Sequence, residues 1–224
     1  MKRHTFAFPV SGAFPVVVLL GLLVLRPELL SARRHPTEPS AGSWQYSEPL
    51  LGVALLVPNG WKAVEMRDPL DADLPGQAHH SVSISREPMD ESKRYPSEMV
   101  VALYRERNTT GSSWHSEGGS AQSRADEFAA KLAEHESEEG APRAKQLGAS
   151  SHGVETWEYE FDLNPGQSSC TFMRLVIYPD PKNWFHAAWQ MPCRKRSKYE
   201  EQMKQMVKSL VVNSEAEPGS TLKH

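Results

Sequence analysis

Two cysteines, Cys170 and Cys193, carry the clearest chemical signal in the sequence, because their spacing suits a disulfide. The residues between them predict two strands of an antiparallel hairpin that turns between Pro181 and Lys182, and this register places the cysteines opposite each other. Directly opposed strand residues lie about 4.5–5.5 Å apart at Cα, which a disulfide can bridge. A four-residue loop over 180–183 keeps the register, because Pro181 disfavours tighter turns. We therefore predict a Cys170–Cys193 disulfide, with two unpaired core thiols as the alternative.

Other residue types that could do chemistry do not form a recognisable site. His79 and His80 could bind a metal with Asp71 or Asp73, but adjacent residues at a strand start point to opposite faces, which favours a solvated pair. His152, followed by glycine, is interpreted as turn chemistry. The sequence has no C-x-x-C, H-E-x-x-H, G-x-S-x-G, phosphate-loop or dinucleotide motif. We therefore predict no catalytic residue, no metal and no cofactor.

A few aromatic and basic residues are candidates for contact with a partner. Trp114 and Trp184 fall in expected loops, where they could bind a partner or cover the edge of the core. The run Arg194-Lys195-Arg196 precedes the last predicted helix and could meet an acidic partner or lipid, or form a solvated connection.

Length and charge narrow the class of protein. The chain has 224 residues, enough for one sizeable domain, and a net charge of −3. Five Lys/Arg and two Asp/Glu lie in residues 1–40, so the remainder has 20 basic and 26 acidic residues, a net charge of −6. Because nucleic-acid binding needs a basic surface, we predict no nucleic-acid partner.

The N-terminal residues have the pattern of an export segment. Lys2 and Arg3 precede an apolar run over 14–25, broken only by Pro15, and the apolar stretch counted from Phe6 has 20 residues. Such a segment is typical of a secretory signal and is also long enough to span a bilayer. We predict that residues 1–32 are a signal peptide or a membrane anchor and that 33–43, rich in Pro and Ser, are a flexible linker. The protein is then extracytoplasmic, in the periplasm or at the cell surface, with residues 6–25 in the membrane if uncleaved.

The rest of the chain predicts an α+β domain over 44–213 and a disordered tail over 214–224. Alternating or apolar segments predict strands at 43–47, 51–57, 61–66, 80–86, 143–150, 154–163, 169–178 and 185–192. Helical patterns occur at 97–107, at 123–136 with a cap from Ser123 and Asp126, and at 198–212 with a capping box from Ser197 and Glu200. We expect an antiparallel sheet flanked by helices.

The segment from Leu56 to Lys62, which reads LVPNGWK, resembles the opening of PsbP-like domains. This superfamily includes the photosystem II extrinsic protein and the DcrB-like envelope lipoproteins. The order of late strands followed by a helix with Tyr199 near its start and Ser209-Leu210 at its end is similar too. The resemblance covers about residues 44–212 and implies an α/β/α sandwich with an accessory or binding role. This chain departs from the pattern in lacking a lipid-attachment cysteine and in its long polar loop over 108–122.

These observations favour an exported, non-enzymatic accessory protein of the cell envelope that binds a protein or a small ligand. An envelope immunity protein against a toxin is the alternative. A hydrolase without a recognisable motif is the third reading, and it would require a pocket that holds clustered acids or histidines with shifted pKa values.

Overall fold

The computed structural model of the chain describes residues 42–66, 78–86, 99–107, 118–137 and 143–216. The predicted export segment and most of the linker lie outside the described residues, as do Asp71, Asp73 and Trp114. No helix within the described ranges is long and apolar enough to cross a membrane.

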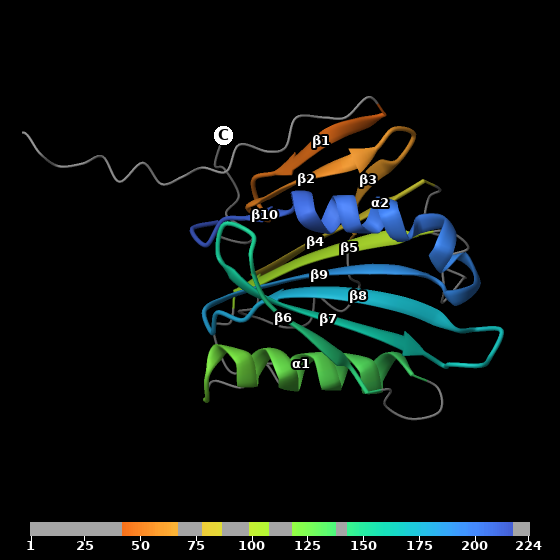
Figure 1. The fold of residues 1–224 in the computed structure, drawn as a ribbon. Coiled ribbons are helices and arrows are strands. Elements are labelled where there is room, and N and C mark those ends of the chain that lie inside the picture. The colour runs from red at the N-terminus through yellow and green to blue at the C-terminus, as the bar shows by residue number, and fades with distance from the viewer. Residues whose placement is uncertain (1–41, 67–77, 87–98, 108–117, 138–142, 217–224) are drawn as a thin grey trace, which may run out of the picture. The chain divides into compact units, whose positions relative to one another are not determined.

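A seven-stranded antiparallel sheet carries most of the described chain (Figure 1). Its strands run in the order β3-β4-β5-β9-β8-β7-β6. Their bounds are β3 (Lys62–Met66), β4 (Ala78–Ser85), β5 (Val100–Arg107), β6 (Lys145–Ser151), β7 (Glu155–Leu163), β8 (Thr171–Tyr178) and β9 (Asn183–Pro192).

Helices cover both faces of this sheet, and the fold class is α+β, as predicted (Figure 1). Helix α1 (Ala121–Glu136) packs on β7 and β8. On the opposite face lie helix α2 (Arg196–Ser209) and a small antiparallel sheet, ordered β1-β2-β10. The strands of that sheet are β1 (Ser43–Glu48), β2 (Val53–Pro58) and β10 (Val211–Val212).

Alternation along the strands divides the apolar interior into two cores. On β7, Tyr159 and Phe161 pack in the core beneath α1. On β8, Met173 joins that core, whereas Phe172 and Val176 pack in the core shared with α2 and the small sheet. Successive strand side chains point to opposite faces, so a strand covered on both sides contributes to both cores.

The β8–β9 hairpin adopts the register predicted from the cysteines. Tyr178 pairs with Phe185, and Cys170 is bonded to Cys193 with their Cα atoms 5.5 Å apart. The loop is four residues long but one position earlier than expected, because β9 begins at Asn183. Asp180 stabilises this loop, since its Oδ1 accepts hydrogen bonds from the backbone N–H groups of Lys182 (2.8 Å) and Asn183 (3.0 Å).

The predicted helix at 97–107 is wrong, because its described part is strand β5. β5 lies between β4 and β9, so both of its edges are paired. Val101 and Leu103 are buried on one face, and Val100 and Ala102 on the other. A short apolar run of this kind suits a doubly covered strand as well as a helix, and only the strand pairing decides between them.

Both correctly predicted helices begin earlier than expected. Ser120, not Ser123, is the N-cap of α1, and its Oγ accepts a hydrogen bond from the Ser123 backbone N–H (3.1 Å). Helix α2 begins at Arg196 without a side-chain cap, because the short 3-10 helix η2 (Cys193–Lys195) leads into it directly from β9. α2 also ends earlier, at Ser209, and the chain then extends into β10.

The first residues of the predicted tail are held against the domain by two polar side chains. Arg105 is fully buried and donates hydrogen bonds to Asn183 Oδ1 (2.9 Å) and the Asn213 carbonyl (2.8 Å). Asn183 Nδ2 donates to the Ser214 carbonyl (2.6 Å) and the Ala216 carbonyl (2.8 Å). Burial lowers the pKa of Arg105 to about 10, although Tyr178 and Asp180 favour its charged form. Ser214 and Ala216, which belong to the predicted tail, are therefore hydrogen-bonded to the domain.

The turn between β6 and β7 joins the two sheets. The backbone N–H of Val212 in β10 donates to the His152 carbonyl (2.6 Å). Gly153 follows with a φ of +91°, and a Cβ at this position would lie 2.6 Å from the Val212 carbonyl oxygen. Glycine is therefore required here both for its backbone conformation and for the close approach of the two chain segments.

The close approach can be separated from the backbone strain by comparing two glycines. Gly166 has a similar φ of +84°, but a Cβ added there would meet no described atom within 4 Å beyond its own chain neighbours. Gly166→Ala should cost about 1–2 kcal/mol of unfolding free energy from the left-handed backbone alone. Gly153→Ala should cost about 1–3 kcal/mol more, because the methyl group collides with β10. Urea unfolding measures the loss of unfolding free energy in each variant. Equal losses in the two variants would contradict the close contact of Gly153 with β10.

Candidate functional site

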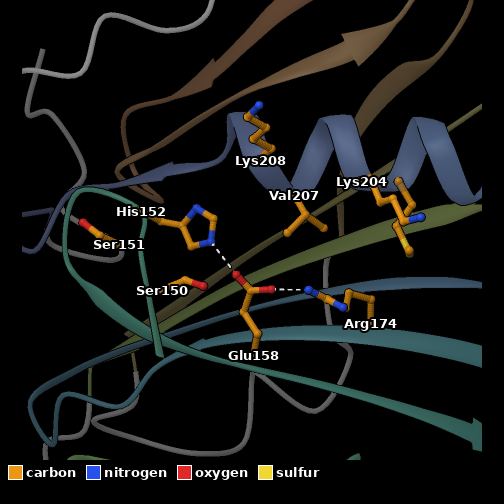
Figure 2. A pocket seen from close by; sticks show the side chains of 9 residues that line it. Ser150, Ser151, His152, Glu158, Arg174, Lys204, Val207 and Lys208 are labelled. Carbon is orange, nitrogen blue, oxygen red and sulfur yellow. Dashed lines mark hydrogen bonds and ion pairs between the residues drawn. The ribbon is translucent and has the colours of Figure 1, made fainter. Parts of the chain in front are cut away.

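A hollow of about 390 Å³ lies between the β6–β7 turn and α2 (Figure 2). Ser150, Ser151 and His152 line it from the turn side, and Glu158 and Arg174 line it from the sheet. Helix α2 closes the other side. Among the described residues, this hollow is where a histidine, a carboxylate and several cations come together.

His152 is buried in this hollow and has a partner at each ring nitrogen. Its Nδ1 lies 3.0 Å from the Leu210 carbonyl oxygen. Its Nε2 lies 3.1 Å from Glu158 Oε1 (Figure 2). Both ring nitrogens are therefore within hydrogen-bond distance of groups of the protein itself.

Glu158 is the anion at the centre of the cluster. Its Oε2 pairs with the Arg174 guanidinium, and its side chain is only 9% exposed. Burial alone would raise the pKa of Glu158, but hydrogen bonds from His152, Ser150 and Arg174, together with the charge of Arg174, outweigh it and lower the pKa to about 2. Glu158 is therefore ionised in the folded protein at neutral pH.

The ion pairs continue along the sheet away from the hollow. Arg174 Nη1 lies 3.6 Å from Glu160 Oε2, and Glu160 Oε1 accepts from Lys145 Nζ at 3.0 Å. Arg196 approaches the same Glu160 at 3.7 Å while its guanidinium lies 3.8 Å from the centroid of the Phe172 ring. Glu158 and Glu160 of β7 thus have cationic partners across the strands, which stabilises charges that are partly removed from water.

The α2 side of the hollow combines an apolar floor with two lysines. Met203 and Val207 are buried there, and Lys204 and Lys208 lie one turn apart on the exposed side. Lys204 Nζ lies 3.2 Å from Glu200 in the preceding turn. Lys208 has no ion pair with any residue in the described ranges.

These groups do not form a nucleophilic site. A serine nucleophile needs a neighbouring base, and both nitrogens of His152 already contact Leu210 and Glu158. Ser150 in the turn is itself hydrogen-bonded to Glu158. Within the described ranges, no group of three His, Cys, Asp or Glu side chains is arranged to hold a metal ion. A pocket with clustered titratable side chains, which a hydrolase would require, is present, but these side chains contact one another.

The structure separates the residues predicted to contact a partner. Trp184 is fully buried in β9 and packs against Phe128 of α1, with ring centroids 5.0 Å apart. The expectation of a loop tryptophan is wrong here, because β9 begins before Trp184 and turns its side chain toward α1. Arg194 is exposed, whereas Lys195 and Arg196 are half-buried. Trp114 lies outside the described residues.

Sequence reasoning missed His152, Glu158 and Arg174 as one cluster. The alternation of β7 did place Glu158 on the face opposite the aromatic residues, and the predicted hairpin placed Arg174 on the face of the cysteines. Glu160 pairs directly with Arg174 across the strands. The missing information was the pairing of β7 with β8 and the contact of the His152 turn with α2, both of which are long-range.

Comparison with known proteins found structural likenesses only. No family model matches the chain, and no curated protein matches it. The chain is similar to the solution structure of cyanobacterial PsbP (CyanoP) from Synechocystis sp. PCC 6803, with 14% identity and a TM-score of 0.47 over 79% of this chain and 95% of that one. A PsbP protein is thus among the solved structures to which this chain is similar.

Two further solved structures are similar. One is the Ran-binding protein Mog1p from Saccharomyces cerevisiae, with 8% identity and a TM-score of 0.44 over 80% of this chain and 97% of that one. The other is LpqN, involved in cell envelope biogenesis of Mycobacterium tuberculosis, with 11% identity and a TM-score of 0.37 over 71% of this chain and 82% of that one. Likenesses at these identities and TM-scores carry no conclusion about what this chain binds.

The ion cluster predicts a specific dependence of stability on pH. The pKa of Glu158 falls from 4.5 to about 2 on folding, so its stabilisation is present above pH 4.5 and is lost as the pH falls toward 2. Glu158→Gln should lower the unfolding free energy by about 3 kcal/mol at pH 7, because it removes the buried anion that pairs with Arg174. The difference from the wild type should shrink as the pH is lowered through this range.

Urea unfolding at several pH values measures this difference. Glu155→Gln is the matched control, since Glu155 is an exposed residue of the same strand. It should change the unfolding free energy by less than about 0.5 kcal/mol. A cost for Glu158→Gln that is equally large at pH 3 and pH 7 would contradict the role of the carboxylate charge.

Proposed function

We propose that this chain is an exported, non-enzymatic protein of the cell envelope that acts by binding another envelope component. The observation that supports this most is the state of the hollow beside α2. Its histidine and its arginine both contact the carboxylate of Glu158, so the three side chains join parts of the fold. A domain of this kind acts through its surface.

The disulfide supports a location outside the cytoplasm. Cytosolic thiols are kept reduced, so a structural disulfide such as Cys170–Cys193 is typical of secreted and periplasmic proteins. The apolar residues 6–25 then act as the export signal or, if they are not cleaved, as the membrane anchor.

Contacts with a protein partner are proposed at the end of β9. Arg194 is exposed there, next to Lys195 and Arg196, and arginine is enriched at protein interfaces. Trp114 remains a second proposed contact. An immunity protein that binds a basic toxin is the second candidate, favoured by the net charge of −6 on the residues after position 40.

A cross-linked pull-down of the tagged full-length protein from its native envelope tests this proposal. One dominant partner in stoichiometric amount is expected, and Arg194→Ala should reduce its recovery. Lys182→Ala is the control, because Lys182 is an exposed cation at the opposite end of the β8–β9 hairpin. Recovery of no partner above background would contradict the proposed role, and enzymatic screening would then take its place.

A further inference from the structure

The hollow between the β6–β7 turn and α2 is positively charged within an acidic chain. Arg174, Lys204 and Lys208 line it, and Glu158 is the one acidic residue in its lining, which leaves a net charge of +2 without His152. The carboxylate of Glu158 is engaged by Arg174 and His152. The two lysines therefore act on whatever enters the hollow without an opposing free carboxylate in the lining.

We propose that this hollow binds a phosphate ester. Lys204 and Lys208 line the hollow from α2, and Ser150 and Ser151 line it from the turn (Figure 2). A phosphate monoester carries up to two negative charges, which two lysines match better than they match a single carboxylate. Lysine is a common phosphate-binding residue because it acts as a compact point charge.

The size and floor of the hollow indicate more than an inorganic ion. A volume of about 390 Å³ lies within the range of small-ligand sites. Met203 and Val207 form an apolar floor beside the lysines. The ligand class is therefore a phosphate group that carries a small organic portion, such as a glycerol phosphate, whether as a soluble compound or as a phospholipid headgroup.

The lysines have an alternative structural role that the test must separate. Lys208 lies in the last turn of α2, where a cation stabilises the helix dipole, and Lys204 pairs with Glu200. If the lysines act only in these two structural roles, replacing them should change the unfolding free energy slightly, and the protein should show no saturable ligand binding. Lys208 has no ion pair in the described part of the chain, so its charge is available to a ligand.

The first arm of the test uses soluble probes. Purified full-length protein is titrated calorimetrically with glycerol 3-phosphate and with inorganic phosphate at constant ionic strength. Saturable binding of glycerol 3-phosphate is expected, weakened about tenfold or more in Lys204→Gln/Lys208→Gln, which removes two charge-assisted contacts. Lys62→Gln/Lys182→Gln is the matched control, because it removes two exposed lysines away from the hollow, and it should leave affinity unchanged.

The second arm identifies the source of the phosphate. Vesicles of phosphatidylglycerol are compared with vesicles of phosphatidylcholine, which measure what the N-terminal apolar segment contributes by itself. Binding of phosphatidylglycerol that is lost only in Lys204→Gln/Lys208→Gln supports the proposal with a lipid headgroup as the ligand. Urea midpoints of both double variants, expected to match, show that the fold is intact.

Several results would overturn the proposed site. Equal weakening in both double variants would indicate general surface charge, and binding of an acidic peptide in place of phosphate probes would indicate a protein partner. The absence of saturable binding to either probe class would reject the phosphate site. The inference rests on the proposed binding role but fails separately from it, because the pull-down can still recover a protein partner through Arg194.

Discussion

The disulfide between Cys170 and Cys193 determines how the elements around the hollow beside α2 are arranged. It clamps the open end of the β8–β9 hairpin, and the backbone there is paired as well, since the Cys193 N–H donates to the Cys170 carbonyl (3.0 Å). Helix α2 begins only three residues after Cys193, so this point also determines where α2 starts on the sheet. The far end of α2 then brings the Leu210 carbonyl to His152. A closed loop of this length is worth about 3–4 kcal/mol in the loop-entropy model.

The polar cluster beside α2 is a second constraint, and it explains why a histidine and a carboxylate in a hollow do not imply catalysis. A buried charge is tolerated only when it is paired and hydrogen-bonded. Glu158 meets this condition through His152 and Arg174, and His152 in turn contacts the Leu210 carbonyl. The same contacts join the β6–β7 turn to α2, so the cluster stabilises the junction between the two sheets. Lys204 and Lys208 also line the hollow, and Lys204 pairs with Glu200 of the same helix.

Local patterns in the sequence are sufficient for the hairpin, the α+β class and both helices, because each depends on residues close together in the chain. The turn at Pro181 and the alternation on either side of it specify the pairing of Cys170 with Cys193. The prediction for the segment that forms β5 is wrong because its apolar run is compatible with both helix and strand, and the difference lies in its pairing with β4 and β9. The prediction that Trp184 lies in a loop is wrong, because β9 begins one residue before it. His152 looks like a turn residue alone because its partner Leu210 lies 58 positions away.

The proposed location outside the cytoplasm is supported mainly by the disulfide that closes the β8–β9 hairpin, and the thiol state of the two cysteines tests this directly. The protein is taken from its native cells, alkylated in denaturant without reductant and analysed by mass spectrometry. We expect Cys170 and Cys193 to remain unmodified until a reductant is added, when both become alkylated. Full alkylation of both residues without reductant would contradict the disulfide, and with it the main support for an extracytoplasmic location.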